Sequence, residues 1–369
     1  MNVPKVTFSD KNPEFYRVVK ERVNNYFREN KISKHANFEM MLKSVIMITL
    51  YAFPIALILT GIVSSTAAVL GMWAIMGFGM AGIGLCIMHD ANHGAYSKNQ
   101  KVNKALGFML TFIGGYRLNW IIQHNVLHHT YANVEGLDED IHQKGVMRFS
   151  PKQGRKGFFK YQIIYAPFLY GLLTLVWYLF KDFAKLVRYN KLGLLEAQGK
   201  TFKRALPEVV FHKTWYTLLF IVLPISIIDL PWWVTIIGYV VMQFICGLFL
   251  SLIFSSGHVV EEAEFYHAIE NSSLENNWAI HQMRTTSNFG NKSRWFTWFI
   301  GGLNHQIEHH LFPQVCHVHY PALKEIVKKT AHEFNVPYHE HKSWYDALKS
   351  HFTLLHNLGT GKTERLAKV

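Results

Sequence analysis

Four long apolar stretches divide a sequence that is otherwise mixed in polarity. They run from about Leu42 to Val63, Ala67 to Met88, Phe211 to Ile228 and Trp232 to Phe254. A helix needs about 20 apolar residues to cross the roughly 30 Å hydrocarbon layer of a bilayer, and each stretch has about that length. Short linkers, Ser64-Ser65-Thr66 and Asp229-Leu230-Pro231, join them in pairs. The pattern therefore predicts two hairpins of membrane-spanning helices.

Two further apolar stretches are interrupted or closely bracketed by polar residues. The stretch from Ala105 to Ile122 contains Gly114, Gly115 and Arg117, and the stretch from Tyr161 to Phe180 lies between two lysines. We interpret both as helices at the membrane interface. The second could instead cross the membrane, but a crossing there would separate the histidine clusters described below.

The chain has 369 residues, of which 50% are hydrophobic, and a formal net charge of +13. In a soluble protein this charge would suggest a nucleic-acid partner. Here the Lys and Arg residues flank apolar stretches, which is typical of segments on the cytoplasmic side of a membrane. We therefore expect both termini on the cytoplasmic side, lipid as a partner and no nucleic acid. The three cysteines are odd in number and indicate no disulfide framework.

Three histidine clusters lie on the side that is expected to be cytoplasmic. The clusters are His89 and His93; His124, His128 and His129; and His305, Gln306, His309 and His310. A spacing of four places side chains on one face of a helix. One isolated pair is more often a buried polar contact, but three clusters favour a shared site for several metal ions.

The number of candidate ligands indicates two metal ions rather than one. His258 follows the fourth apolar stretch and His281 precedes the third cluster, and both are added to the candidates. Imidazole ligands alone do not name the metal, although an all-nitrogen set without thiolate is compatible with iron that activates dioxygen. We expect Asp90 and Glu308 to hydrogen-bond the outer ring nitrogens of the ligands. Gln243 is expected to hydrogen-bond between helices.

The remaining histidines lack such a pattern, and surface or capping roles are expected for them. They are His35, His142, His212, His267, His317, His319, His332, His339, His341, His351 and His356.

The clusters His89-Asp90-Ala91-Asn92-His93, His124 to His129 and Gln306-Ile307-Glu308-His309-His310 resemble the three histidine boxes of the membrane fatty acid desaturases. The similarity extends from about Met41 to Pro321. Gln306, followed by Leu311-Phe312-Pro313 after the box, resembles the front-end and linoleoyl-CoA-type branch.

The resemblance implies a di-iron centre, dioxygen as co-substrate and removal of two hydrogens from an acyl chain. It implies an acyl substrate carried by CoA, acyl carrier protein or lipid. No fused cytochrome b5 module is recognised, so a separate donor such as ferredoxin or cytochrome b5 is expected. The ligand set is then His89, His93, His124, His128, His129, His258, His281, Gln306, His309 and His310, with no catalytic residue beyond it.

Two points stay open at the level of sequence. His305 also lies four residues before His309, so either His305 or Gln306 could approach the metal; family position favours Gln306. An acyl, alkane or carotenoid hydroxylase would use the same ligands. A metal transporter would place its polar ligands near the middle of the membrane instead.

These observations together predict an all-α integral membrane protein with about four membrane-spanning helices in two hairpins and a cytoplasmic helical cap that holds a di-metal site. We divide the chain into a cytoplasmic N-terminal segment (1–40), a membrane desaturase catalytic domain (41–321) and a cytoplasmic C-terminal segment (322–369).

Overall fold

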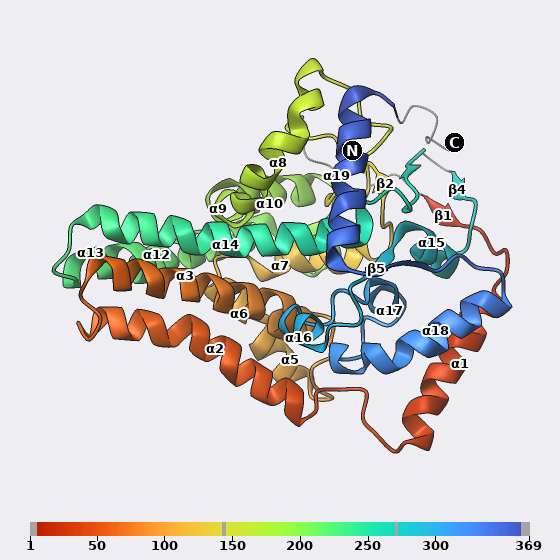
Figure 1. Ribbon diagram of the computed structural model, residues 1–369, viewed down its shortest axis with the longest axis horizontal. Coiled ribbons are helices and arrows are strands. Elements are labelled where there is room, and N and C mark those ends of the chain that lie inside the picture. The colour runs from red at the N-terminus through yellow and green to blue at the C-terminus, as the bar shows by residue number, and fades with distance from the viewer. Residues whose placement is uncertain (1–5, 142–144, 270–271, 363–369) are drawn as a thin grey trace.

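The computed structural model describes residues 6–141, 145–269 and 272–362 and is mostly helical (Figure 1). Four helical segments are long and apolar enough to cross a membrane, as the sequence predicts. They are α2 (Phe38–Leu59), α3 continuing through α4 (Thr66–Asn92), α12 continuing through α13 (Phe202–Ile227) and α14 (Trp232–His258). They lie side by side in the left half of Figure 1, and the linkers of both helix pairs lie at the same end.

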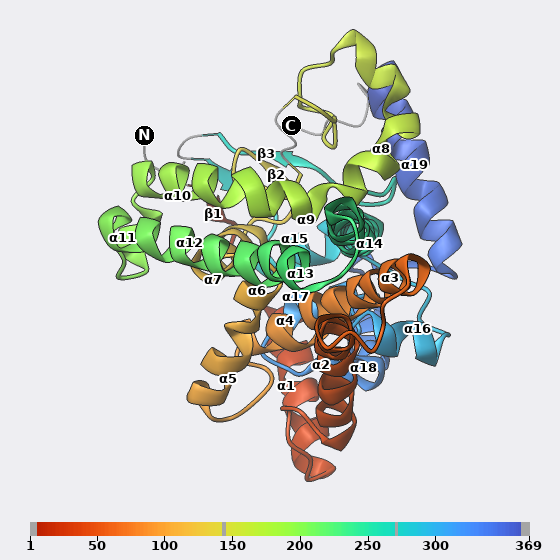
Figure 2. The same cartoon turned by 90° about the vertical axis from the view of Figure 1, so that its left-hand side faces the viewer.

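Helix α14 is at the centre of this bundle and packs closely against α3, as the end-on view in Figure 2 shows. Small residues make the contact possible. A Cβ atom at Gly238 would lie only 2.1 Å from the ring of Trp73. Likewise, a Cβ at Gly79 would lie 2.5 Å from the backbone nitrogen of Tyr51 on α2. Glycine thus permits the close backbone approach on which packing between membrane helices depends. Gln243 Nε2 donates to the hydroxyl of Tyr216 at 3.0 Å, so the predicted interhelical bond is confirmed.

Each of the two shorter apolar stretches forms a sharply bent pair of helical segments rather than one continuous helix, and their position at the interface stays a prediction. The segments Gln100–Phe112 and Arg117–His128 meet at 106°, and Gly157–Gly171 and Leu173–Lys191 meet at 64°. The first bend contains Gly114 at φ +85°, a backbone conformation that side chains with a Cβ rarely adopt. At the second bend, Gly171 packs against Phe244 of α14. The first pair comprises α5 (Gln100–Gly107), α6 (Met109–Phe112), α7 (Arg117–Trp120) and the turn Ile121–His128; the second comprises the turn Gly157–Tyr161, α8 (Gln162–Gly171), α9 (Leu173–Val176), the turn Trp177–Lys181 and α10 (Asp182–Lys191).

The remaining helices form a cap at the right of Figure 1, over one end of the bundle. Phe15 and Val19 of α1 pack with Leu323 and Val327 of α18 in a separate apolar core. Three pairs of short parallel strands also join distant parts of the chain, so the described residues are not entirely α-helical. The cap elements are α1 (Glu14–Glu29), α15 (Trp278–Thr285), α16 (Arg294–Phe299), α17 (Gln306–Leu311), α18 (Tyr320–Glu333) and α19 (Trp344–Thr360); the strand pairs are β1 (Thr7–Phe8) with β4 (Ser273–Leu274), β2 (Val134–Glu135) with β3 (Tyr266–His267), and β5 (Ser287–Phe289) with β6 (His339–His341).

Candidate metal centre

Four separate elements bring nine of the predicted ligand residues to one end of the bundle. His89 lies on α4 at the end of the second span, and His93 directly follows α4. His258 is the last residue of α14, so the fourth span continues beyond the Phe254 limit predicted from the sequence. The other members are His124, His128 and His129 on or next to a turn before β2, and Gln306, His309 and His310 on α17.

A local change of helix pitch explains how three histidines of the second cluster face the same way. The residues Ile121–His128 form a π-helical turn, and the amide of His129 donates to the carbonyl of His124 at 2.9 Å. In a π-helix the hydrogen bond joins residues five apart, so positions i, i+4 and i+5 lie close together. His124 therefore shares a face with both His128 and His129.

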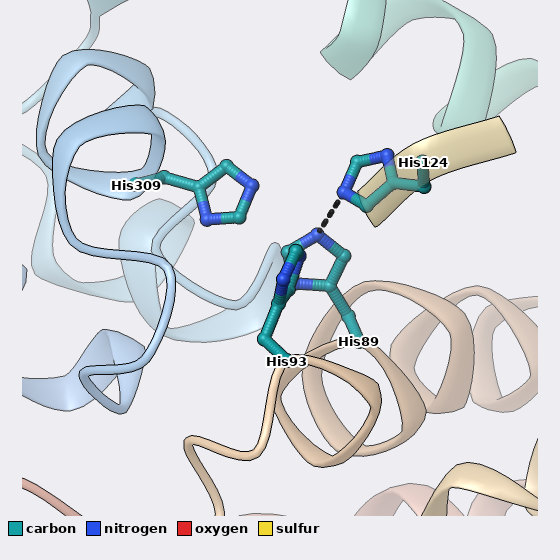
Figure 3. Close-up of side chains that lie close together, drawn as sticks. All are labelled: His89, His93, His124 and His309. Atoms are coloured by element: carbon teal, nitrogen blue, oxygen red, sulfur yellow. Dashed lines mark hydrogen bonds between the residues drawn. The ribbon is translucent and has the colours of Figure 1, made fainter. Parts of the chain in front are cut away.

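The first histidine group consists of His89, His93, His124 and His309, each with a ring nitrogen within 4.8 Å of the others (Figure 3). His89 Nε2 lies 3.1 Å from His124 Nε2. Two ligands that each lie about 2.1 Å from one ion are about 3 Å apart when they adjoin in its coordination sphere. This separation fits two imidazoles that bind one cation.

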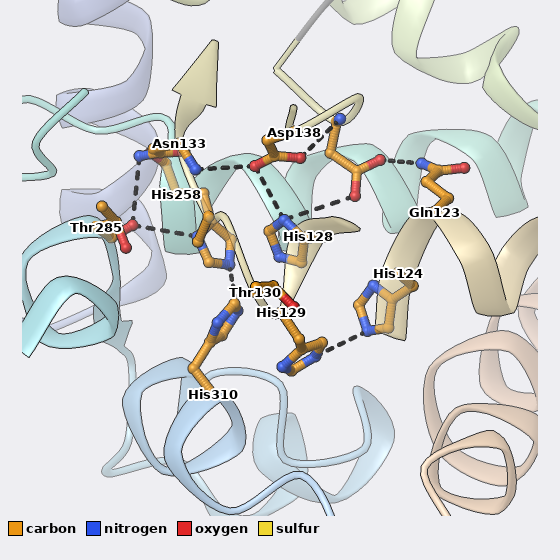
Figure 4. Close-up of polar contacts among 12 residues, drawn as sticks. Gln123, His124, His128, His129, Thr130, Asn133, Asp138, His258, Thr285 and His310 are labelled. Carbon is orange, nitrogen blue, oxygen red and sulfur yellow. Dashed lines mark hydrogen bonds and ion pairs between the residues drawn. The ribbon is translucent and has the colours of Figure 1, made fainter. Parts of the chain in front are cut away.

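The second group consists of His128, His258 and His310 (Figure 4). His310 Nε2 lies 3.1 Å from His258 Nε2, and Gln306 Oε1 lies 3.3 Å from the same nitrogen. His129 lies between the two groups, because it also forms a cluster with His309 and His310.

The outer nitrogen of several of these rings is held by a neighbouring group, so that the other nitrogen faces the centre. His128 Nδ1–H donates to Asp138 at 3.0 Å, and His310 Nδ1–H donates to Gln282 at 2.8 Å. His258 Nδ1–H donates to the carbonyl of Thr285 at 3.2 Å (Figure 4). Such contacts fix ring orientation and tautomer in metal sites. These partners are not predictable from the sequence, because no local spacing connects Gln282 with His310.

The expected role of Asp90 and Glu308 is wrong. Asp90 Oδ1 is 3.8 Å from His89 Nδ1, beyond hydrogen-bond distance, and Asp90 instead accepts a bond from His317. The Glu308 carboxylate accepts bonds from Asn288 and Tyr338. Asp138 makes the carboxylate–histidine contact that was assigned to them.

A buried polar chain leads from the second span to the first. The side chain of Lys43 on α2 is only 1% exposed, and its ammonium lies 2.8 Å from His317 Nε2. An ammonium can only donate, so His317 Nε2 accepts this bond. The other ring nitrogen, Nδ1–H, then donates to Asp90 at 2.8 Å, next in the chain to His89.

Two histidines for which surface or capping roles were expected are buried. His317 takes part in the chain above, and His351 on α19 lies between Tyr170 and the carbonyl of Val259. Both were misjudged because their partners are more than 90 residues away in sequence. His142 lies outside the described residues. The others are exposed or half-buried, as predicted: His35, His212, His267, His319, His332, His339, His341 and His356.

His281 and His305 are placed outside the two groups. His281 Nε2–H donates to the carbonyl of Ala132 at 2.8 Å. The ring of His305 faces Asn291, whose amide lies 2.8 Å from Nδ1, and the carboxylate of Glu308 is 3.6 Å from that same nitrogen. The structure thus brings Gln306, rather than His305, next to another candidate ligand.

Three of the grouped histidines are suited to bind a cation in their neutral form, whereas the contact with Asp138 outweighs burial and raises the pKa of His128. Burial, reinforced by neighbouring histidines, holds the pKa of His129, His309 and His310 well below the usual range. At neutral pH each ring therefore keeps a lone pair for a ligand bond. Within the described residues, Nε2 of His93 and Nε2 of His309 have no hydrogen-bond partner although both atoms are buried. A metal ion within the first group would satisfy both nitrogens, so the residues present fit such an ion.

A cavity of about 400 Å³ lies between the helical bundle and the two histidine groups. Its wall is largely apolar and includes Leu85, Leu173 and Phe254, together with His89, His124 and His309. An apolar chain in this cavity would lie directly against the candidate metal ligands.

Known proteins identify the family to which this arrangement belongs. The sequence matches the fatty acid desaturase family over residues 64–342. It is 33% identical over 356 residues to the sn-1 linoleoyl-lipid 6-desaturase of Synechocystis sp., covering 94% of this chain and 95% of that protein. It is 37% identical to the acyl-lipid (8-3)-desaturase of Physcomitrium patens (94% and 72% covered) and 31% identical to that of Mortierella alpina (94% and 78%).

The chain belongs to the fatty acid desaturase family and is a fatty acyl desaturase, an oxidoreductase. The family resemblance drawn from the three histidine clusters is confirmed, as is its similarity to front-end and acyl-lipid desaturases.

Proposed function

We propose that the chain is a dioxygen-dependent desaturase that acts on lipid-linked acyl chains and uses two iron ions. The observation that carries this proposal is the pair of histidine groups at the wall of an apolar cavity. His89, His93, His124 and His309 would hold one ion; His128, His258, His310 and Gln306 would hold the other, with His129 between them. Bound iron would activate dioxygen, which is the oxidant that removes two hydrogens from neighbouring methylenes.

The atoms and electrons of this reaction balance only with an outside reductant. The acyl CH₂–CH₂ unit loses two electrons and two protons, and a donor supplies two more electrons. Together with two further protons from water, these convert one dioxygen into two waters. We propose that a separate carrier protein supplies the two electrons that do not come from the acyl chain.

The residues of the chain bind and orient the substrate and its oxidant. The apolar wall holds the methylenes and excludes water, and the contacts of His128 with Asp138 and of His310 with Gln282 keep the rings in place. Lys185 also lines the cavity, and its charge suits an anionic group at the carrier end of the substrate, whereas Arg188 is already paired with Glu139 at 3.1 Å. The lipid-linked substrate is further supported by the relatives, which are a linoleoyl-lipid 6-desaturase and an acyl-lipid (8-3)-desaturase. The basic residues beside the spans support a cytoplasmic site and cytoplasmic termini.

The test is expression in a host that lacks this activity, followed by analysis of its lipids and of metal bound to the purified protein. For wild type we expect a new double bond in acyl lipids and about two iron ions per chain. For His128→Ala we expect loss of the product and loss of bound iron, with the protein still in the membrane. His356→Ala, at an exposed position, is the matched control. A hydroxylated product would favour the acyl hydroxylase instead, and zinc without new product would overturn both.

A further inference from the structure

A second cavity of about 680 Å³ approaches the metal centre and shares no lining residue with the acyl cavity. Its wall is strongly cationic. Lys98, Lys101 and Lys104 on or beside α5 are exposed, as is Lys34 before α2. None of the residues that line it in the described part of the chain is an Asp or Glu. These four lysines also have no ion-pair partner among the residues that the structure describes.

The inner wall of this cavity is formed by the ligand-bearing turn itself. His93 and Asn92 line it. Arg117, which also lines it, donates through Nε to Asn92 Oδ1 at 2.7 Å. A partner seated on the lysines would thus contact the turn that carries one of the proposed iron ligands.

The charge of the cavity decides which of the reactants it suits. An acyl chain requires an apolar wall, and dioxygen is neutral and gains nothing from lysines. A proton path through His35, which also lines the cavity, would gain nothing from four lysines, because lysine stays charged at neutral pH. What remains is the electron supply. A cluster of uncompensated positive charge attracts and orients an acidic macromolecule.

We propose that this cationic cavity is the docking site of an acidic one-electron carrier protein, which delivers two electrons in succession to the centre behind His93. In each encounter the carrier is oxidised by one electron and the iron centre is reduced by one. This inference rests on the proposed function. An anionic lipid headgroup could also contact the lysines, but the position of the cavity beside a ligand-bearing turn favours an electron carrier.

The experiment compares two ways of supplying electrons to protein in neutral detergent, where anionic lipid is absent. The variant Lys98→Glu/Lys101→Glu/Lys104→Glu is assayed with reduced [2Fe–2S] ferredoxin or the soluble domain of cytochrome b5, both acidic. In parallel, the protein is reduced anaerobically with dithionite before dioxygen is admitted. The matched control Lys152→Glu/Lys191→Glu/Lys203→Glu makes the same charge change at exposed lysines outside both cavities.

We expect kcat/KM for the protein donor to fall about 10-fold or more at low salt, and its dependence on ionic strength to weaken, since charge steering raises association rates by about 10- to 1,000-fold. Product from the dithionite-reduced protein should match wild type. Unchanged turnover with both protein donors overturns the proposal, as does an equal fall in the control. An equal loss with dithionite also overturns it, because the lysines would then support the site itself. Wild-type protein that makes no product with either reductant would instead refute the proposed function.

Discussion

At the scale of single residues, the third histidine cluster shows how two adjacent side chains at the start of one short helix face different partners. His305 is the residue before α17 and turns towards Asn291, whereas Gln306 begins the helix and turns towards His258. Both lie four residues before a histidine, so spacing could not separate them. The difference arises because the backbone of His305, at φ −103° and ψ 56°, is not yet helical.

We predict that Gln306→Ala loses more iron and more product than His305→Phe. The amide oxygen of Gln306 is a weak ligand whose place imidazole can take, so Gln306→His should keep substantial activity. Iron content and product yield are measured for the three variants in the same membranes. If His305→Phe loses an iron equivalent and Gln306→Ala keeps both, the assignment of Gln306 is wrong.

The buried ammonium of Lys43 leads to a second prediction. Lys43→Met removes the positive end of the chain through His317 to Asp90 and leaves the buried carboxylate with less compensation. Loss of one partner from a buried charged set costs about 3–5 kcal/mol. We expect a lower melting temperature in detergent, partly restored when Asp90→Asn is added.

Lys34→Met, at an exposed lysine, is the control for this experiment and should change stability by less than about 0.5 kcal/mol. Equal melting temperatures of Lys43→Met and Lys34→Met would show that the hydrogen bonds from Lys43 through His317 to Asp90 contribute nothing to stability.

At the scale of elements, helix α19 is held to the bundle by a histidine that must stay neutral. His351 Nδ1–H donates to the carbonyl of Val259, and Nε2 accepts from Tyr170, both at 2.7 Å. Burial lowers the pKa of His351 to about 4, although the bond to Val259 acts in the opposite direction. Both ring nitrogens are therefore engaged, and a proton added to Nε2 would displace the hydrogen bond from Tyr170.

We predict that this contact weakens as the pH falls from about 6.5 to about 4. In this window the unfolded chain, with a histidine pKa near 6.5, binds a proton that the folded protein excludes, so stability decreases with decreasing pH by at most about 3 kcal/mol. Melting temperature is measured against pH for wild type, His351→Gln and the exposed-site control His356→Gln. The melting temperature should depend less steeply on pH only in His351→Gln. An equal dependence in all three proteins would contradict the role assigned to His351.

At the scale of the whole molecule, the two short linkers lie at the end of the bundle opposite the histidines (Figure 1). Cysteines placed at Ser65 and Asp229 should react with a membrane-impermeant maleimide added from outside the cell, whereas a cysteine at Lys191 should react only after the membrane is opened. All three positions are exposed, and native Cys86, Cys246 and Cys316 are buried, so background labelling is low. Labelling of Ser65 and Lys191 from the same side would refute the proposed topology.

The sequence by itself determined the four apolar helices, because each must be long enough to satisfy its own backbone within a bilayer. It also determined that histidines share helical faces, since the spacing within each cluster is a local property of one or two helical turns. The bends of the helices at Gly114 and Gly171 were not predicted from the sequence, because hydropathy does not show backbone direction.

Only the tertiary structure decided which polar groups support the histidines. Lys43 and His317 are 274 residues apart, and His310 and Gln282 are 28 apart, so no periodicity connects them. The fold also separated candidates that looked alike in sequence: His258 points into the second group, whereas His281 points to the carbonyl of Ala132. Spacing shows which side chains share a helical face, but a buried polar atom finds its partner only when several elements pack together.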